Sequence, residues 1–140
     1  MFTLMITSSI YRIYRNSDKN SDIWLRVKKT NKGYGVFALK DYEEGEFVVE
    51  YIGELIDKKE YNQRMASGPR RYMFDLFNTK SNHYYIDAQN SSNKSRCINH
   101  SCHANCIMRA INIKGEVKLA LFTIQRIALG EEITYNYYSW

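Results

Sequence analysis

The residues best suited to chemistry lie in the segment from Arg96 to Cys106, which reads RCINHSCHANC. Its three cysteines and two histidines are potential ligands for Zn²⁺. A structural zinc site usually takes its ligands from two separated pairs, and the lack of a second pair argues against zinc. The segment also leaves open a thiolate nucleophile at Cys102 activated by His100, although neither an oxyanion site nor an orienting group can be read.

Two further motifs offer backbone and aromatic groups to a ligand. Gly33 and Gly35 lie in the segment KGYGVFA, and glycines so placed let a backbone approach a ligand or turn tightly. No G-K-[ST] follows and a third glycine is missing, so this is neither a P-loop nor a dinucleotide fingerprint. The segment from Gly130 to Trp140, GEEITYNYYSW, indicates core or edge packing of a strand. The alternative is that it walls a narrow channel for a long aliphatic side chain with a cationic head, because aromatic faces attract alkylammonium groups.

The elements that must position these motifs are mostly short strands. Runs rich in Val, Ile, Phe and Tyr predict strands at 23–28, 34–39, 46–52, 72–77, 83–88, 107–113, 116–124 and 132–137. Lys114-Gly115 predicts a hairpin turn between two of them. One helix is predicted to start at Asp57 and to end at Gly68-Pro69. The fold class that follows is mostly β, a β-rich α+β fold without βαβ units.

Composition limits the class of protein. The 140 residues, 16.6 kDa, suffice for one domain. Hydrophobic residues make up 44%, which excludes wholesale disorder, and the net charge of +5 permits an anionic partner without requiring one. Three cysteines exclude a disulfide scaffold and favour a reducing compartment. No stretch approaches the roughly 20 apolar residues that span a bilayer, so no membrane partner is expected.

In this order and at this spacing, the motifs resemble the SET-domain protein-lysine (histone-lysine) N-methyltransferases. The most specific parts are the Asn-His-Ser-Cys block at 99–102 and the Gly-Glu-Glu-Ile-Thr-Tyr-Asn-Tyr block at 130–137. The other matching segments are 33–38, 45–56, 72–74, 86–88, Asn93 and 122–127. We expect residues 1–22 to form an N-terminal arm, 23–138 the SET domain and 139–140 a C-terminal tail.

The resemblance implies a SET fold of small β-sheets around a threaded pseudoknot core, with one or two short helices. The segment that carries Asn99 and His100 would pass through a loop formed near the C-terminal motif. It also implies S-adenosyl-L-methionine as the methyl donor, released as S-adenosyl-L-homocysteine. Donor and target lysine would enter from opposite faces and meet through a channel.

The resemblance also assigns roles to single residues. Cofactor contacts fall on Lys32, Gly33, Tyr34, Gly35, Tyr72, Arg96, Asn99 and His100, and the substrate channel on Tyr72, Phe74, Tyr135 and Tyr137. Tyr137 matches the catalytic tyrosine. Tyr135 matches the position where phenylalanine or tyrosine sets how many methyl groups are added, and a tyrosine there is similar to the monomethylating members.

An aromatic channel suits this reaction. The lysine amine, with a reference pKa of about 10.4, must lose a proton before it attacks. A desolvated channel disfavours the charged ammonium and helps that loss. The reaction implied is a direct displacement at the sulfonium methyl, to which the protein contributes alignment and electrostatics.

The sequence departs from the family pattern in three places. Cys97 stands where a bulky apolar residue is usual, and Ala104 where proline is usual. Many relatives continue into a cysteine-rich segment that binds zinc together with the counterpart of Cys102. That segment is absent here, so we expect no zinc and a buried thiol at Cys102. Tyr138 and Trp140 would close the channel instead, unless a partner or a second copy in a homodimer completes the cofactor site.

Other functions stay open at this stage. One is a non-catalytic SET-like module that binds chromatin or protein. The presence of Asn99, His100 and Tyr137 argues against it, because a degraded cofactor site would lack such residues. Another is a zinc-stabilised nucleic-acid-binding domain built on the Cys/His cluster and the basic arm. For the main hypothesis we expect a histone tail (H3 or H4) within the nucleosome as substrate, and non-specific DNA contact through the basic surface is left open. The place of work would be chromatin in the nucleus, or the host nucleus for a viral or bacterial protein.

Overall fold

The computed structural model describes residues 21–68, 72–77, 83–90, 92–113 and 115–137. Most of the expected N-terminal arm, together with Pro69, Lys114, Tyr138 and the 139–140 tail, therefore lies outside the described residues. The elements in chain order are η1 (Ser21–Trp24), β1 (Leu25–Thr30), β2 (Gly33–Ala38), β3 (Phe47–Tyr51), β4 (Glu54–Asp57), α2 (Lys58–Ala66), β5 (Met73–Phe77), β6 (His83–Asp87), η2 (Lys94–Cys97), β7 (Asn99–His100), β8 (Cys106–Ile113), β9 (Glu116–Thr123) and β10 (Glu132–Tyr135).

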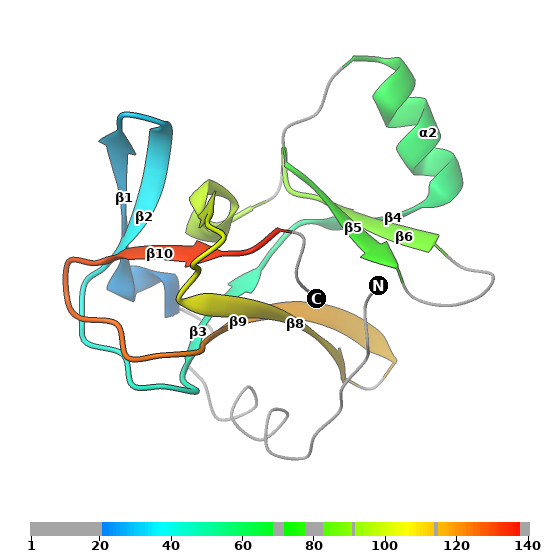
Figure 1. The fold of residues 1–140 in the computed structure, drawn as a ribbon. Coiled ribbons are helices and arrows are strands. Elements are labelled where there is room, and N and C mark those ends of the chain that lie inside the picture. The colour runs from blue at the N-terminus through cyan, green and yellow to red at the C-terminus, as the bar shows by residue number, and fades with distance from the viewer. Residues whose placement is uncertain (1–20, 69–71, 78–82, 91, 114, 138–140) are drawn as a thin grey trace.

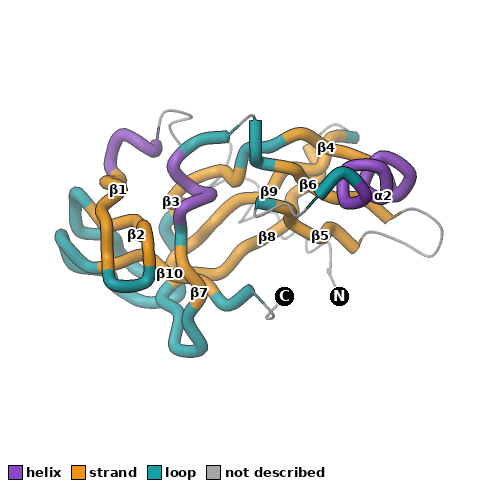
Figure 2. Tube along the Cα trace, turned by 90° about the horizontal axis from the view of Figure 1, so that it is seen from above, coloured by secondary structure: helices purple, strands orange, loops and turns teal. Residues whose placement is uncertain are grey.

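The strands form two sheets, which confirms the predicted mostly-β class. The larger sheet has the order β1-β2-β10-β8-β9-β3, with β7 paired to β10, and the smaller has the order β4-β6-β5. The β1–β2 hairpin and α2 lie at opposite ends of the molecule (Figure 1, Figure 2). The helices of the described residues are too short or too polar to cross a membrane.

Each of the eight predicted strands is found, and two further strands were not predicted. The tight β8–β9 hairpin is closed by the pairing of Ile113 with Glu116, and Gly115 takes a φ of +86° that suits glycine. The additional strands are β4, whose four residues run directly into the helix, and the two-residue β7. Both depend on pairing with chain segments far away in the sequence, which a local pattern does not report.

The helix α2 begins and ends as predicted from its caps. The Asp57 carboxylate accepts a hydrogen bond from the backbone N–H of Glu60 at 2.8 Å, which satisfies a free donor of the first turn. At the other end Gly68 adopts a φ of +133°, and its N–H donates to the carbonyl of Met65. One face of α2 rests on the small sheet, where the rings of Tyr61 and Tyr85 stack 3.7 Å apart.

Strand β10 joins parts of the chain that are distant in sequence. It pairs antiparallel with β2 and parallel with both β7 and β8. Asn105 fastens the same junction, because its amide nitrogen donates to the carbonyl of Glu132 at 2.8 Å and its amide oxygen accepts from the N–H of Thr134 at 3.0 Å. The Asn105 side chain therefore acts as an additional rung of the β10 ladder.

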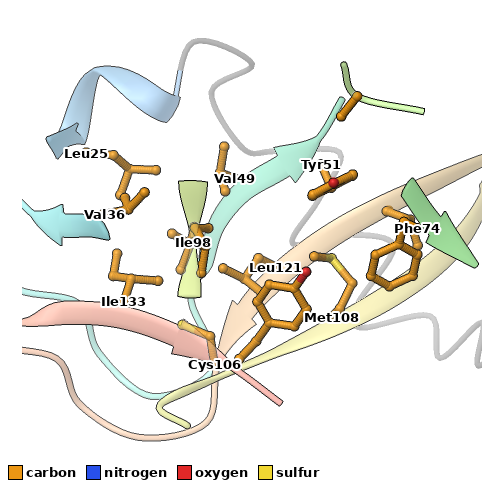
Figure 3. Packing of buried hydrophobic residues seen from close by; sticks show 14 of the residues in the cluster. Leu25, Val36, Val49, Tyr51, Phe74, Ile98, Cys106, Met108, Leu121 and Ile133 are labelled. Atoms are coloured by element: carbon orange, nitrogen blue, oxygen red, sulfur yellow. The ribbon is translucent and has the colours of Figure 1, made fainter. Parts of the chain in front are cut away.

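The larger of the two buried clusters of the described residues lies at this junction. Ile98, the residue before β7, has almost no exposed surface. Figure 3 shows its side chain close to those of Val36 and Ile133, with Leu121 nearby. Burying one such side chain stabilises the fold by about 1.5–3 kcal/mol relative to leaving it exposed. The cluster therefore fixes the positions of β7 and β10.

Replacing Asn105 with alanine should therefore destabilise the whole domain. The substitution removes the partner of the half-buried N–H of Thr134 and C=O of Glu132, which we expect to lower the free energy of unfolding by about 1–3 kcal/mol. Urea denaturation followed by circular dichroism measures this. Asn62→Ala on the exposed surface of α2 is the matched control and should change stability by less than about 0.5 kcal/mol. Equal effects of the two substitutions would show that Asn105 does not hold the junction.

Candidate functional site

The junction brings three of the predicted site segments into contact. The Asn99 amide, on β7, donates to the carbonyl of Tyr34 on β2 at 2.9 Å. The backbone N–H of Tyr137, which follows β10, donates to Nδ1 of His100 at 3.1 Å, and the Tyr137 hydroxyl donates to the carbonyl of Ile98 at 2.7 Å. Three segments that lie far apart in the sequence, around Tyr34, Asn99 and Tyr137, thus meet at one place.

The strand β2 approaches this place through its glycines. A Cβ on Gly35 would lie 2.9 Å from a carboxylate oxygen of Glu132 and 3.2 Å from the Asn99 amide nitrogen, so a larger residue would displace both. The pairing of β2 with β10 reaches only Val36 and Phe37. Residues 33–35 therefore extend beyond this pairing, where the Tyr34 carbonyl accepts from Asn99 and the Tyr34 side chain is 62% exposed. Lys32 lies in the preceding turn, where its N–H donates to the Thr30 hydroxyl at 3.1 Å.

His100 is oriented by the chain end of β10. Because its Nδ1 accepts a hydrogen bond, a neutral imidazole must carry its proton on Nε2. That nitrogen lies 3.5 Å from Sγ of Cys102. Cys102 is exposed, so the prediction of a buried thiol is wrong. The reason is local: Cys102 lies in a turn that leaves β7, and the two-residue strand is too short to bring it into the core.

The other two cysteines belong to the core. Cys97 packs against the large cluster, which explains how it can replace a bulky apolar residue. Cys106 is buried, and burial raises the pKa of its thiol to about 12. Among the described residues no three His, Cys, Asp or Glu side chains gather closely enough to hold a metal ion.

A continuous series of aromatic rings leads from the core to the junction. The ring centroids of Tyr51 and Phe74 lie 5.5 Å apart, those of Phe74 and Tyr135 6.5 Å, and those of Tyr135 and Tyr137 4.7 Å. The first three are buried, whereas Tyr137 is 36% exposed. His100 extends the series, with its ring 5.2 Å from that of Tyr137.

Tyr51 is a residue that sequence reasoning did not single out for the site. The available signal was its place inside the matched segment 45–56, at the end of a predicted strand. A tyrosine at that place is also an ordinary core residue, so the sequence could not decide between the two. Its contact with Phe74 depends on how the small sheet packs on the large one.

Burial controls the protonation of these phenols. Desolvation is the main cause that raises the pKa of Tyr51 and of Tyr135 well above the ordinary value near 10, and the nearby Tyr137 raises both further. Both hydroxyls therefore stay neutral to a higher pH than an exposed phenol does. The inner part of the aromatic series is a poorly hydrated environment without a charged phenol.

Arg96 and Tyr72 contact each other next to η2. The side chain of Asn93 caps η2 by accepting from the N–H of Ser95 at 3.0 Å, which fixes the turn that carries Arg96. The Arg96 guanidinium lies 4.7 Å from the centre of the Tyr72 ring and donates to the carbonyls of Ala88 and Gln89. Tyr72 thus lies at the edge of the core cluster, under a cation.

Comparison with known proteins gives consistent similarities. A family model described as the SET domain matches residues 33–138. The chain is 37% identical over 119 residues to the variant-silencing SET domain-containing protein of Plasmodium falciparum, covering 81% of this chain and 5% of that protein. It is 38% identical over 107 residues to the histone-lysine N-methyltransferase, H3 lysine-36 specific, of Candida albicans (76% and 13%) and 40% identical over 112 residues to the histone-lysine N-methyltransferase trithorax of Drosophila virilis (75% and 3%). The chain spans only a small part of the length of each.

A solved structure shows the same fold. It is described as ctPRC2 in an autoinhibited conformation bound to S-adenosylmethionine. The TM-score is 0.76 at 33% sequence identity, over 89% of this chain and 16% of that one.

The buried phenols generate a prediction about pH. Because the pKa of Tyr135 is raised in the folded state, the unfolded state ionises first as the pH rises past about 10. The contribution of the neutral Tyr135 phenol to the free energy of unfolding is fully present below that pH and is lost as the pH rises above it. The free energy of unfolding, measured with urea from neutral to alkaline pH, should fall less steeply in Tyr135→Phe than in the wild type. The same steepness in both proteins would contradict a buried, neutral phenol.

Proposed function

The chain belongs to the SET-domain family, and on this basis we propose that it transfers a methyl group from S-adenosyl-L-methionine to a lysine amine of a histone tail. One observation carries the proposal. The Tyr137 hydroxyl is held on the Ile98 carbonyl at the exposed end of a buried aromatic series, beside the segment of Asn99 and His100.

The residues around Gly35 fit a cofactor of this chemistry. The lack of a Cβ at Gly35 lets the Asn99 amide and the Glu132 carboxylate come close to the backbone of β2, so polar groups gather beside residues 33–35. We assign cofactor contacts to Lys32, Gly33, Tyr34, Gly35, Tyr72, Arg96, Asn99 and His100. When bound, S-adenosyl-L-methionine supplies an electrophilic methyl group on a sulfonium. The amide, imidazole and guanidinium groups offer polar partners on the side of η2 and β7, while the backbone offers them on the side of β2.

The aromatic series would receive the lysine. Phe74 and Tyr135 are buried and Tyr137 lies next to them, so an amine that docks against these rings would be desolvated, which disfavours the ammonium form and favours a neutral amine. The proton of the amine leaves to water at the open end, where Tyr137 is partly exposed. No Asp or Glu is needed as a base.

Tyr137 has a hydrogen-bond geometry suited to orient this amine. Its hydroxyl proton is directed to the carbonyl of Ile98, so the oxygen presents its lone pairs to the channel. Such an oxygen accepts an N–H from the amine and turns the nitrogen lone pair toward the methyl group. Alignment of this kind is the chief contribution expected from the protein.

The number of methyl groups follows from Tyr135. Its side chain is buried between Phe74 and Tyr137, and its neutral hydroxyl occupies room that a methylated amine would need. We therefore propose that the protein is a monomethylating enzyme.

The place of work and the partners follow from the proposed substrate. Two of the relatives described above are named for histone-lysine methylation, and a basic net charge suits a nucleosomal partner. We propose that residues 23–138 are the SET domain, that it acts on the tail of histone H3 or H4 in chromatin, and that its basic surface contacts DNA without sequence preference.

Removing the Tyr137 hydroxyl tests the assignment. In Tyr137→Phe we expect kcat to fall about 100- to 1,000-fold, the usual loss for one well-placed hydrogen-bonding group. The dissociation constant of S-adenosyl-L-homocysteine should change little. Methylation of recombinant nucleosomes and free histones is followed by intact-mass spectrometry. Tyr61→Phe removes a hydroxyl from the ring stacked on Tyr85, outside the site, and should retain wild-type activity. Full activity of Tyr137→Phe would overturn its proposed role.

Product distribution tests Tyr135 separately. Tyr135→Phe removes only the buried hydroxyl and should let a second or third methyl group accumulate on the same lysine, whereas the wild type should stop at one. The masses of the histone products distinguish these outcomes. Accumulation of three methyl groups by the wild-type protein would contradict the proposal.

A further inference from the structure

One arginine outside the site ties the helix α2 to two strands of the small sheet, β4 and β6. The Arg64 guanidinium, on α2, meets Glu54 of β4 through two nitrogen–oxygen contacts of 2.7 and 2.9 Å. It also contacts Glu60 at 2.8 Å and Asp87, at the end of β6, at 2.9 Å. Its side chain is only 18% exposed. Three carboxylates thus share one planar cation.

Among the three carboxylates, Asp87 depends most on the charge of Arg64. It is 2% exposed, and a buried carboxylate that loses its counter-charge is strongly unfavourable. Its other oxygen accepts the backbone N–H of Gln89 at 3.0 Å. Arg64 therefore fixes the turn from 87 to 89 as well as the carboxylate itself.

The opposite side of this turn belongs to the site. The N–H of Ala88 donates to the carbonyl of Tyr72 at 2.8 Å. The carbonyls of Ala88 and Gln89 accept from Arg96, at 3.2 and 2.9 Å, and Arg96 covers the ring of Tyr72. The turn is thus held between two arginines, one on α2 and one in the site.

Tight packing next to the turn leaves little room for compensation. A Cβ on Gly53 would lie 2.5 Å from a methyl carbon of Ile86 and 2.9 Å from the carbonyl oxygen of Asp87. The chain entering β4 therefore lies directly against the end of β6. If Asp87 moves, the backbone of residues 88 and 89 must move with it, because Gly53 blocks movement on the other side.

We propose that Arg64 is a positioning residue for this site, which sets the places of Tyr72 and Arg96 through the 87–89 turn without touching either. An arginine is required, because a planar guanidinium can serve three carboxylates at once, whereas a lysine ammonium on its flexible stem cannot keep this geometry. The inference deepens the proposed function, and its effect on cofactor binding and methylation rests on that function. The local structural effect does not.

Hydrogen exchange tests the structural part. Arg64→Lys keeps a positive charge for Asp87 and should fold. We expect amide exchange at Ala88 and Gln89 to become at least about tenfold faster, with the β8–β9 amides unchanged. The matched control is Arg126→Lys, since Arg126 also lies between two carboxylates, Asp41 and Glu43, but is 58% exposed. Unchanged exchange at Ala88, or equal acceleration at every amide, would overturn the proposal.

Binding tests the functional part. By titration calorimetry, we expect S-adenosyl-L-homocysteine to bind Arg64→Lys about tenfold more weakly than the wild type, and Arg126→Lys to bind as the wild type does. Wild-type affinity in Arg64→Lys would contradict the proposed role. If the wild-type protein does not bind this ligand, the proposed function fails, while the exchange result still decides whether Arg64 holds the turn.

Discussion

The parallel contact between β10 and β7 is the interaction on which the rest of the molecule depends. Two residues of β7 are enough, because Asn105 adds side-chain hydrogen bonds to β10 and Ile98 is anchored in the core just before β7. Without this contact, the segment of Asn99 and His100 would have no fixed relation to Tyr137. The candidate site is therefore a direct product of the long-range pairing of the fold.

The same burial that stabilises the molecule also prepares it for chemistry. Desolvation raises the pKa of Tyr51 and Tyr135, and it would lower the pKa of a lysine ammonium brought beside them. The one tyrosine of the series that reaches solvent, Tyr137, has its hydroxyl proton directed to a backbone carbonyl. Charged side chains lie outside this aromatic series. Arg64 contacts Asp87 and Arg96 contacts the Gln89 carbonyl, so the two arginines hold the 87–89 turn from both sides.

Much of the fold could be predicted because its signals are local. Runs of Val, Ile, Phe and Tyr marked the strands, and the caps at Asp57 and Gly68 marked the helix. What could not be predicted depends on contacts between distant segments. β7 exists only because β10 lies beside it, and the exposure of Cys102 follows from the turn that leaves so short a strand.

The candidate site shows the same division. The order of motifs sufficed to name Asn99, His100 and Tyr137, and the structure brings these residues into contact. Tyr51 was missed because a buried tyrosine on a strand is common. Arg64 carries no motif at all, and its importance is visible only when its three carboxylates are seen together.

The most direct test of the central claim is a two-dimensional NMR titration of the isotopically labelled protein with S-adenosyl-L-homocysteine. If β10 joins three distant segments into one site, the amide signals of Gly35, Asn99, His100 and Tyr137 should shift together with a single dissociation constant, while those of α2 stay in place. Shifts confined to one of these segments, or centred on α2, would contradict a single site assembled at the β7–β10 junction.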